Sequence, residues 1–76
     1  MLIAKKRQRV LNALAAVRDF IWIEDLYLLL RSKGEAISSR TVHDTVWELN
    51  RIGLICCQVE GRRTMVKLQS DEAYFF

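Results

Sequence analysis

The sequence contains no proline, only three glycines and a single adjacent pair of cysteines in 76 residues. Without proline, repeats or low-complexity stretches, no linker is expected before the last few residues. We therefore predict one domain over residues 1–69, followed by a tail at 70–76. Cys56 and Cys57 cannot easily bond to each other and form no disulfide framework, which favours a reduced compartment.

Long hydrophobic runs are also missing. No stretch of about 18 apolar residues is present, which excludes a membrane-spanning helix. The basic opening at residues 1–7 is followed by too broken an apolar run for a secretory signal, so no membrane association and a cytoplasmic location are expected. Hydrophobic residues make up 51% of the chain and charged residues 28%, which is sufficient for a small globular fold.

The residues needed for metal binding or catalysis are scarce. His43 is the only histidine, and two cysteines supply too few ligands for zinc, so neither a metal nor a cofactor is expected. On a strand, Cys56 and Cys57 point to opposite faces, and one is expected to pack inward. The chain has no glycine-rich phosphate loop and no Ser-His-Asp spacing, and therefore an enzyme is not expected.

Apolar periodicity predicts three helices. Residues 2–17 carry an apolar stripe, and residues 24–33 begin with an acidic pair and end before Gly34. Ser38 can cap a third helix over 39–52, with a glycine directly after it. The predicted core consists of Val10, Leu14, Val17, Leu26, Leu29, Leu30, Val42, Val46, Leu49 and Leu54.

Three further segments favour strands. Residues 20–23 suit a brief edge strand, and residues 54–59 and 64–69 suit a hairpin in which Gly61 supplies the turn. Helix, short strand, helix, turn, helix and hairpin is the order of a winged helix-turn-helix. The predicted fold class is therefore α+β, a three-helix bundle with a C-terminal β-hairpin wing.

Several segments from the second predicted helix to the start of the hairpin match a known pattern. They are Glu-Asp-Leu-Tyr at 24–27, Leu-Arg-Ser-Lys-Gly at 30–34, Ile-Ser at 37–38, Thr-Val at 41–42 and Leu-Asn-Arg-Ile-Gly-Leu-Ile at 49–55. Over residues 23–55 the chain resembles the DNA-binding half of the ferric uptake regulator family and, more loosely, small bacterial and phage winged-helix repressors. The resemblance implies a DNA-binding winged helix.

The sequence also departs from that family. Where the family places a DNA-contacting tyrosine after the Thr-Val pair, this chain has His43. The resemblance does not extend to the family's metal-binding and dimerising domain, with its histidine-rich and Cys-x-x-Cys ligands. Metal sensing is therefore not expected from this sequence.

Polar residues gather on the face of helix 39–52 opposite its apolar stripe. They predict a protein that binds double-stranded DNA sequence-specifically and regulates transcription, with this helix in the major groove and the wing on phosphates. The alternative is that these residues only solvate an exposed helix. The candidate DNA-binding residues are Ser39, Arg40, Thr41, His43, Asp44, Trp47, Arg51, Arg62 and Arg63.

A homodimer is also expected, because one such domain reads few base pairs and two can read half-sites a helical turn apart. Trp47 is not a usual base reader, and packing against a partner chain or the wing is as good an interpretation as DNA contact. The candidate surfaces for a protein partner are Leu28, Trp47 and the aromatic tail Tyr74, Phe75 and Phe76.

The competing hypothesis is a winged-helix protein-interaction module that does not bind DNA. A net charge of only +3 and the acidic Asp44 and Glu48 on the third helix keep this alternative open. A basic cluster at residues 5–9 is as consistent with a solvated helix face as with phosphate contact. A continuous positive band through the candidate arginines would favour DNA, and a broken one would favour a protein partner.

Overall fold

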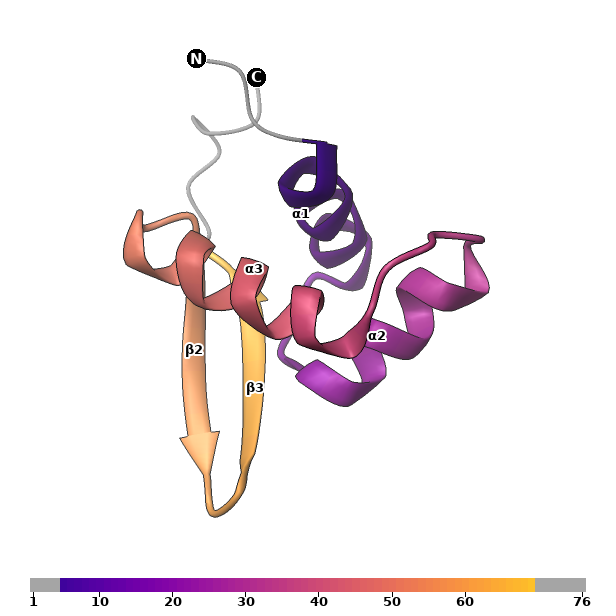
Figure 1. The fold of residues 1–76 in the computed structure, drawn as a ribbon. Helices are drawn as coiled ribbons and strands as arrows, with labels where there is room; N and C mark the ends of the chain where they lie inside the picture. The colour runs from indigo at the N-terminus through magenta and orange to yellow at the C-terminus, as the bar shows by residue number, and fades with distance from the viewer. Residues whose placement is uncertain (1–4, 70–76) are drawn as a thin grey trace.

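The computed structural model of the chain describes residues 5–69, so residues 70–76, with the predicted tail and its three aromatics, lie outside the described part. The three helices form one body from which a hairpin projects (Figure 1). The elements in order are α1 (Lys5–Val17), β1 (Ile21–Trp22), α2 (Ile23–Ser32), α3 (Ser39–Arg51), β2 (Ile55–Glu60) and β3 (Arg63–Leu68). The prediction of an α+β winged helix is confirmed.

The sheet has three antiparallel strands in the order β1-β3-β2. The predicted edge strand is present, with Ile21 opposite Val66 and Trp22 opposite Met65. Its predicted end was wrong, because Ile23 begins α2 and is buried in the core instead of extending the strand. The other predicted bounds of α2 and the hairpin strands are each displaced by one residue.

Glycine ends α3 as the sequence predicts, although the last helical residue lies one position before the expected end. Gly53 has a φ of 86°, a left-handed conformation that costs glycine little. The N–H groups of Gly53 and Leu54 donate to the carbonyl oxygens of Asn50 and Leu49, at 3.1 and 3.0 Å. This pair of bonds is a Schellman motif, and it satisfies carbonyls at the helix end.

One apolar cluster joins the three helices to the sheet. Seven of the predicted core residues are confirmed, while Leu29 and Leu54 are only partly buried against the cluster. Val17 was wrong: it is half-buried at the last position of α1, where Arg18 turns the chain away with a φ of 64°. The buried residues are Val10, Leu11, Ala13, Leu14, Ile23, Leu26, Leu30, Ile37, Val42, Val46, Leu49, Ile55 and Val66.

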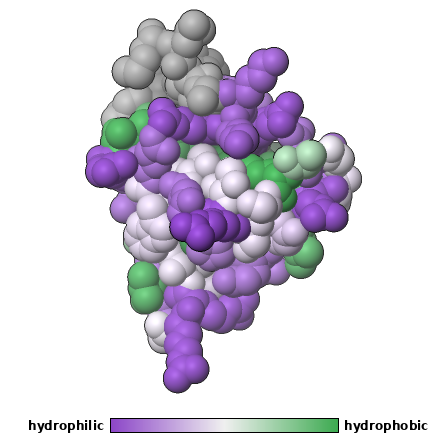
Figure 2. Space-filling model, viewed as in Figure 1, coloured by the Kyte–Doolittle hydropathy of each residue, from purple (hydrophilic) through white to green (hydrophobic). Residues whose placement is uncertain are grey.

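The helices are short and two-sided. None of those in residues 5–69 has both the length and the apolar character needed to cross a membrane. Their buried faces meet at the cluster, and the face seen in Figure 2 carries hydrophilic and intermediate residues with small, separate hydrophobic patches. The candidate contact residues therefore lie on a surface whose underlying helices are fixed by packing.

Candidate nucleic-acid interface

Helix α3 is held by one face. Val42, Val46 and Leu49 are all fully buried, as the sequence predicts. A salt bridge between Arg7 of α1 and Glu48 of α3 adds a second attachment at the edge of this packing. Because core packing leaves a buried helix few alternative positions, the opposite face of α3 is presented in a fixed orientation.

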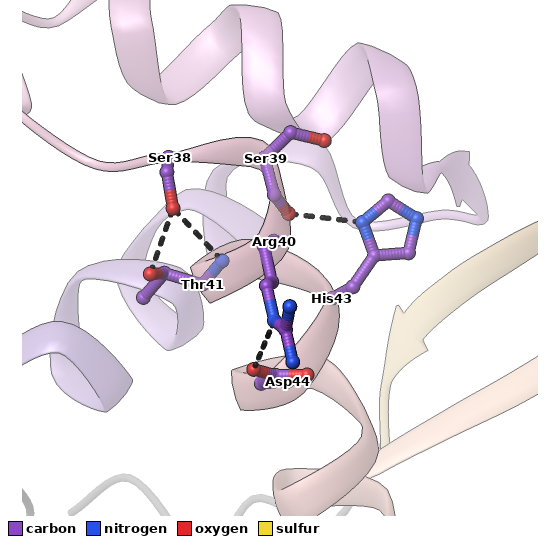
Figure 3. A network of polar contacts seen from close by, with 6 residues as sticks. All are labelled: Ser38, Ser39, Arg40, Thr41, His43 and Asp44. Carbon is purple, nitrogen blue, oxygen red and sulfur yellow. Dashed lines mark hydrogen bonds and ion pairs between the residues drawn. The ribbon is translucent and has the colours of Figure 1, made fainter.

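The first turn of α3 is closed by a local cap (Figure 3). The backbone N–H of Thr41 donates to Ser38 Oγ at 3.1 Å, and the Ser38 hydroxyl donates to Thr41 Oγ1 at 2.9 Å. The cap predicted at Ser38 is therefore present. Of the two residues expected at this helix start, Thr41 is half-buried and participates in the cap, whereas Ser39 is exposed.

Arg40 projects from the same turn. Its side chain is 91% exposed, and its Nε lies 3.8 Å from Asp44 Oδ2, one helical turn along (Figure 3). An exposed pair at this spacing is worth about 0.3–0.5 kcal/mol, so a ligand can displace Asp44 at little cost. The guanidinium is thus oriented by Asp44 while its other N–H groups face solvent.

His43 points to a different side of the helix (Figure 3). Its Nδ1 lies 2.9 Å from the carbonyl oxygen of Ser39. Because a carbonyl oxygen only accepts hydrogen bonds, this contact assigns the proton to Nδ1. In the neutral ring Nε2 is then an acceptor.

One side of α3 borders a shallow, widely open hollow that is lined by residues of this helix alone. Its lining comprises Asp44, Trp47, Glu48, Asn50 and Arg51. Trp47 is 44% exposed and Arg51 is exposed in the last turn, so the sequence correctly expected both on the outer side of the helix. An indole, two carboxylates and a guanidinium on one side of the helix make this part of α3 chemically mixed.

The wing closes with a two-residue turn. Glu60 pairs with Arg63, and Gly61 and Arg62 form the turn, with a φ of 62° at Gly61. Positive φ at the first central position is the requirement that glycine meets in such hairpins. Arg62 is exposed at the tip of the hairpin.

Arg63 has a different environment from Arg62. Its Cζ lies 3.9 Å from the centre of the Trp22 ring, and its Nε lies 3.6 Å from Glu24 Oε1. The sequence prediction treated both arginines as equivalent phosphate contacts and missed Trp22 and Glu24 as wing supports. Their role depends on the pairing of β1 with β3, which no local pattern reveals.

The basic residues do not form a continuous band. Arg40 is paired with Asp44 and Arg63 with Glu24. In the basic first helix, Arg9 Nε lies 2.7 Å from Glu35 Oε2, beside the Arg7 pair already described. Positive charge is therefore interrupted by carboxylates along the interface, and several arginines have an intramolecular partner.

The cysteines lie on opposite faces of β2, as expected. Cys57 packs against the core, and burial followed by the neighbouring Cys56 raises the pKa of its thiol. The thiol of Cys56 donates to the side-chain oxygen of Gln69. Within residues 5–69 no three His, Cys, Asp or Glu side chains are grouped as metal ligands, and we assign no metal to this site.

Several solved structures share this fold. A structure of the DNA recognition and protein interaction domains of HOP2 has a TM-score of 0.75 and 16% identity, covering 82% of this chain and 95% of that chain. The ferric uptake regulator of Francisella tularensis, solved with iron, has a TM-score of 0.82 and 16% identity. That of Vibrio cholerae, a structure that reveals rearrangement of its DNA-binding domains, has a TM-score of 0.82 and 23% identity.

Both regulator structures cover 95% of this chain, which in turn spans 56% of each of them. No curated protein matches the sequence. The sequence profile of the ferric uptake regulator family matches residues 1–75, which extends the resemblance seen over residues 23–55 to almost the whole chain. Sequence and fold thus agree that the chain belongs to the ferric uptake regulator family, with the winged-helix fold of its DNA-binding domain.

Proposed function

We propose that this chain is a transcriptional regulator that binds double-stranded DNA sequence-specifically, with α3 in the major groove and the wing tip on the phosphate backbone. The two-sidedness of α3 carries the proposal. Val42, Val46 and Leu49 fix one face, while Arg40 extends from the other almost fully exposed. A helix supported in this way fits the width of a major groove, and the adjacent hairpin can follow neighbouring phosphates.

The proposed contacts divide by chemistry. Arg40 has a forked donor suited to the two acceptors of guanine, and His43 Nε2 can accept from the exocyclic amine of adenine or cytosine. Arg62 at the tip can follow phosphates, which positions the domain without reading sequence. The remaining candidates are Ser39, Thr41, Asp44, Trp47, Arg51 and Arg63, and we assign no cofactor, metal or catalytic step.

Double-stranded DNA and a second copy of the chain are the partners we propose. A single winged helix reads few base pairs, and two related by a two-fold axis read two half-sites with one geometry. The expected operator is therefore a palindrome or near-palindrome. Leu28, at 61% exposure, remains a candidate protein surface beside Trp47.

Selection from a pool of random duplexes tests the proposal directly. The full chain should enrich a motif, and an Arg40→Ala variant should lose preference at one position of each half-site. If duplexes of every sequence bind equally, the sequence-specific reading by α3 is wrong. If no duplex binds even at low salt, where phosphate contacts are strongest, DNA binding itself is wrong.

The second candidate function is a protein-interaction module, and two observations favour it: carboxylates interrupt the positive charge of the candidate arginines, and Trp47 is partly exposed on α3. Trp47 is partly exposed and lines the same shallow hollow as Asp44 and Glu48. Aromatic residues of this kind often contribute much of the binding energy at protein interfaces. A folded chain that binds no duplex, in the selection above, would leave this as the leading function.

A further inference from the structure

Strand β2 forms an open edge of the sheet. It is the outermost strand in the order β1-β3-β2, at the left of the hairpin in Figure 1. Within residues 5–69, the backbone hydrogen bonds outside helices and strands involve none of residues 55–60. Along β2, the backbone groups that do not face β3 are therefore left for an external partner.

The turn decides which groups these are. Glu60 and Arg63 close a two-residue loop, which makes them a hydrogen-bonded pair, and such pairs alternate along an antiparallel ladder. The N–H and C=O groups of Glu60, Gln58 and Cys56 consequently face β3. Those of Ile55, Cys57 and Val59 point outward, and they offer three donors and three acceptors along one line.

This edge carries few of the features that keep exposed strands from pairing. Proteins usually protect an edge with lysine, proline, a bulge or a very short strand. The paired register of β2 is continuous over six residues without a bulge, and the chain has no proline. The one charge on β2 is Glu60, at the turn end. The opposite edge strand, β1, has only two residues.

We propose that a second copy of this chain pairs with β2 in antiparallel fashion, about a two-fold axis that passes beside Cys57. In this register Cys57 lies opposite Cys57 of the partner subunit, and Ile55 lies opposite Val59 of the partner subunit. The outward-facing backbone groups of these three residues then lie opposite the same groups of the partner subunit. Two hydrogen bonds for each residue pair give about six in total. A register displaced by two residues would pair only two of them.

The side chains support the same register. Ile55, Cys57 and Val59 share one face of β2, where Ile55 is buried and Val59 is 60% exposed. The pairing places the exposed Val59 beside the partner's strand and covers part of its apolar surface, whereas Ile55 is already buried within its own subunit. Glu60 lies opposite Leu54 of the partner subunit, so no like charges meet across the axis.

The symmetry also suits a two-fold operator. An axis perpendicular to the sheet keeps the same sheet face on the same side in both copies. Each α3 contacts β2, so both helices lie on one side of the joined six-stranded sheet, formed from two sheets of three. This step rests on the proposed DNA binding, whereas the pairing itself does not.

A proline substitution tests the edge. Val59→Pro removes an N–H that β3 does not use and puts a ring on the edge, a position where proline is tolerated in strands. Val59→Thr keeps the N–H and serves as the matched control. In sedimentation equilibrium of the full chain without DNA, the parent and Val59→Thr should dimerise, and Val59→Pro should dimerise about tenfold more weakly or not at all.

Amide exchange of the parent chain provides a test that needs no variant. Exchange at Cys57 and Val59 should slow as protein concentration rises, while the amide of Gln58, bonded to β3, should be protected at every concentration. If Val59→Pro fails to fold, this measurement decides. Exchange at Cys57 and Val59 that does not depend on concentration overturns the proposal.

The remaining outcomes separate the two proposals. A parent that stays monomeric at all concentrations, or a folded Val59→Pro variant that dimerises like the parent, overturns pairing through β2. A Val59→Pro variant that binds one half-site normally but loses cooperative binding to two supports it. Self-association through β2 without binding to any duplex would overturn only the proposed function.

Discussion

Three arginines of the proposed interface differ in what surrounds them. Arg40 is nearly free in solvent beside Asp44, Arg62 occupies the tip of the wing, and Arg63 is stacked on Trp22. Free guanidinium groups can reorient toward a base or a phosphate, whereas a stacked group must first give up its contact. Their effects on DNA binding should therefore differ in kind.

Arg40 should determine base preference. Replacing Arg40 with alanine should weaken binding to the preferred duplex by about 1–3 kcal/mol and to unrelated duplexes much less, because a bidentate contact to guanine is lost. Fluorescence anisotropy with labelled duplexes measures both. Arg40→Lys is the control, since it keeps the charge and loses the fork. If Arg40→Lys discriminates as well as the parent, Arg40 contacts only phosphate.

The two wing arginines should be distinguishable by salt. Arg62→Ala should lower the slope of log affinity against log salt by about one unit, because one phosphate contact is lost. Arg63→Ala should leave that slope nearly unchanged and lower the free energy of unfolding by about 0.5–1 kcal/mol, because a cation–π contact is lost. Equal reductions in slope would restore the sequence-based prediction that both contact phosphate.

Cys57 should make stability depend on alkaline pH. Burial, and then the neighbouring Cys56, raise the pKa of its thiol above the usual value for cysteine, so the unfolded chain releases this proton at lower pH than the folded one. The stabilisation is complete below the unfolded pKa and is lost as pH rises through the folded pKa. Urea unfolding across this range should show a steeper decline for the parent than for Cys57→Ala. Parallel curves would contradict the assignment.

At the scale of elements, α3 could be recognised from sequence because its signals are local. The Ser38 cap reaches only to Thr41, and the Gly53 exit involves residues within the preceding turn. The supports of the wing could not be recognised in this way. The contact of Trp22 with Arg63 spans much of the chain and depends on the register between β1 and β3, which is set by folding.

The candidate site shows the same division. The apolar periodicity of α3 correctly put Arg40 opposite Val42 and Val46, because a helix of known phase fixes which residues share a face. It could not reveal that Asp44 pairs with Arg40, or that Glu24 reaches the wing. Such pairs depend on rotamers and on neighbouring elements, so charge counted along the sequence overstated the free positive surface.

Truncating a side chain on the buried face of α3 should strongly lower the free energy of unfolding. Leu49→Ala should lower the free energy of unfolding by about 2–5 kcal/mol, because Leu49 is fully buried and its truncation leaves a cavity. Leu28→Ala is the matched control, since Leu28 is exposed and should cost less than about 0.5 kcal/mol. Urea denaturation compares them, and an unchanged midpoint for Leu49→Ala would show that α3 is packed by another face.

For the whole molecule, a net charge of +3 says little about DNA binding, because several of the basic residues form ion pairs with carboxylates. What counts is the number of cations that a phosphate can reach without first breaking an intramolecular contact. Glu24 matters most in this respect, since it pairs with Arg63 close to the wing. Neutralising Glu24 should free the Arg63 guanidinium for a phosphate, in addition to raising the net charge by one.

We therefore expect Glu24→Gln to raise the affinity for nonspecific duplex DNA and to steepen the salt dependence by up to about one unit. Asp25→Asn is the matched control, because it changes the net charge equally in the same turn of α2, and Asp25 has no ion pair within residues 5–69. Anisotropy titrations at several salt concentrations compare the two variants. If both raise affinity equally, long-range charge explains the effect. If only Glu24→Gln does, Arg63 is a cation held in reserve by its intramolecular partner, and Glu24 limits how strongly the wing binds phosphates.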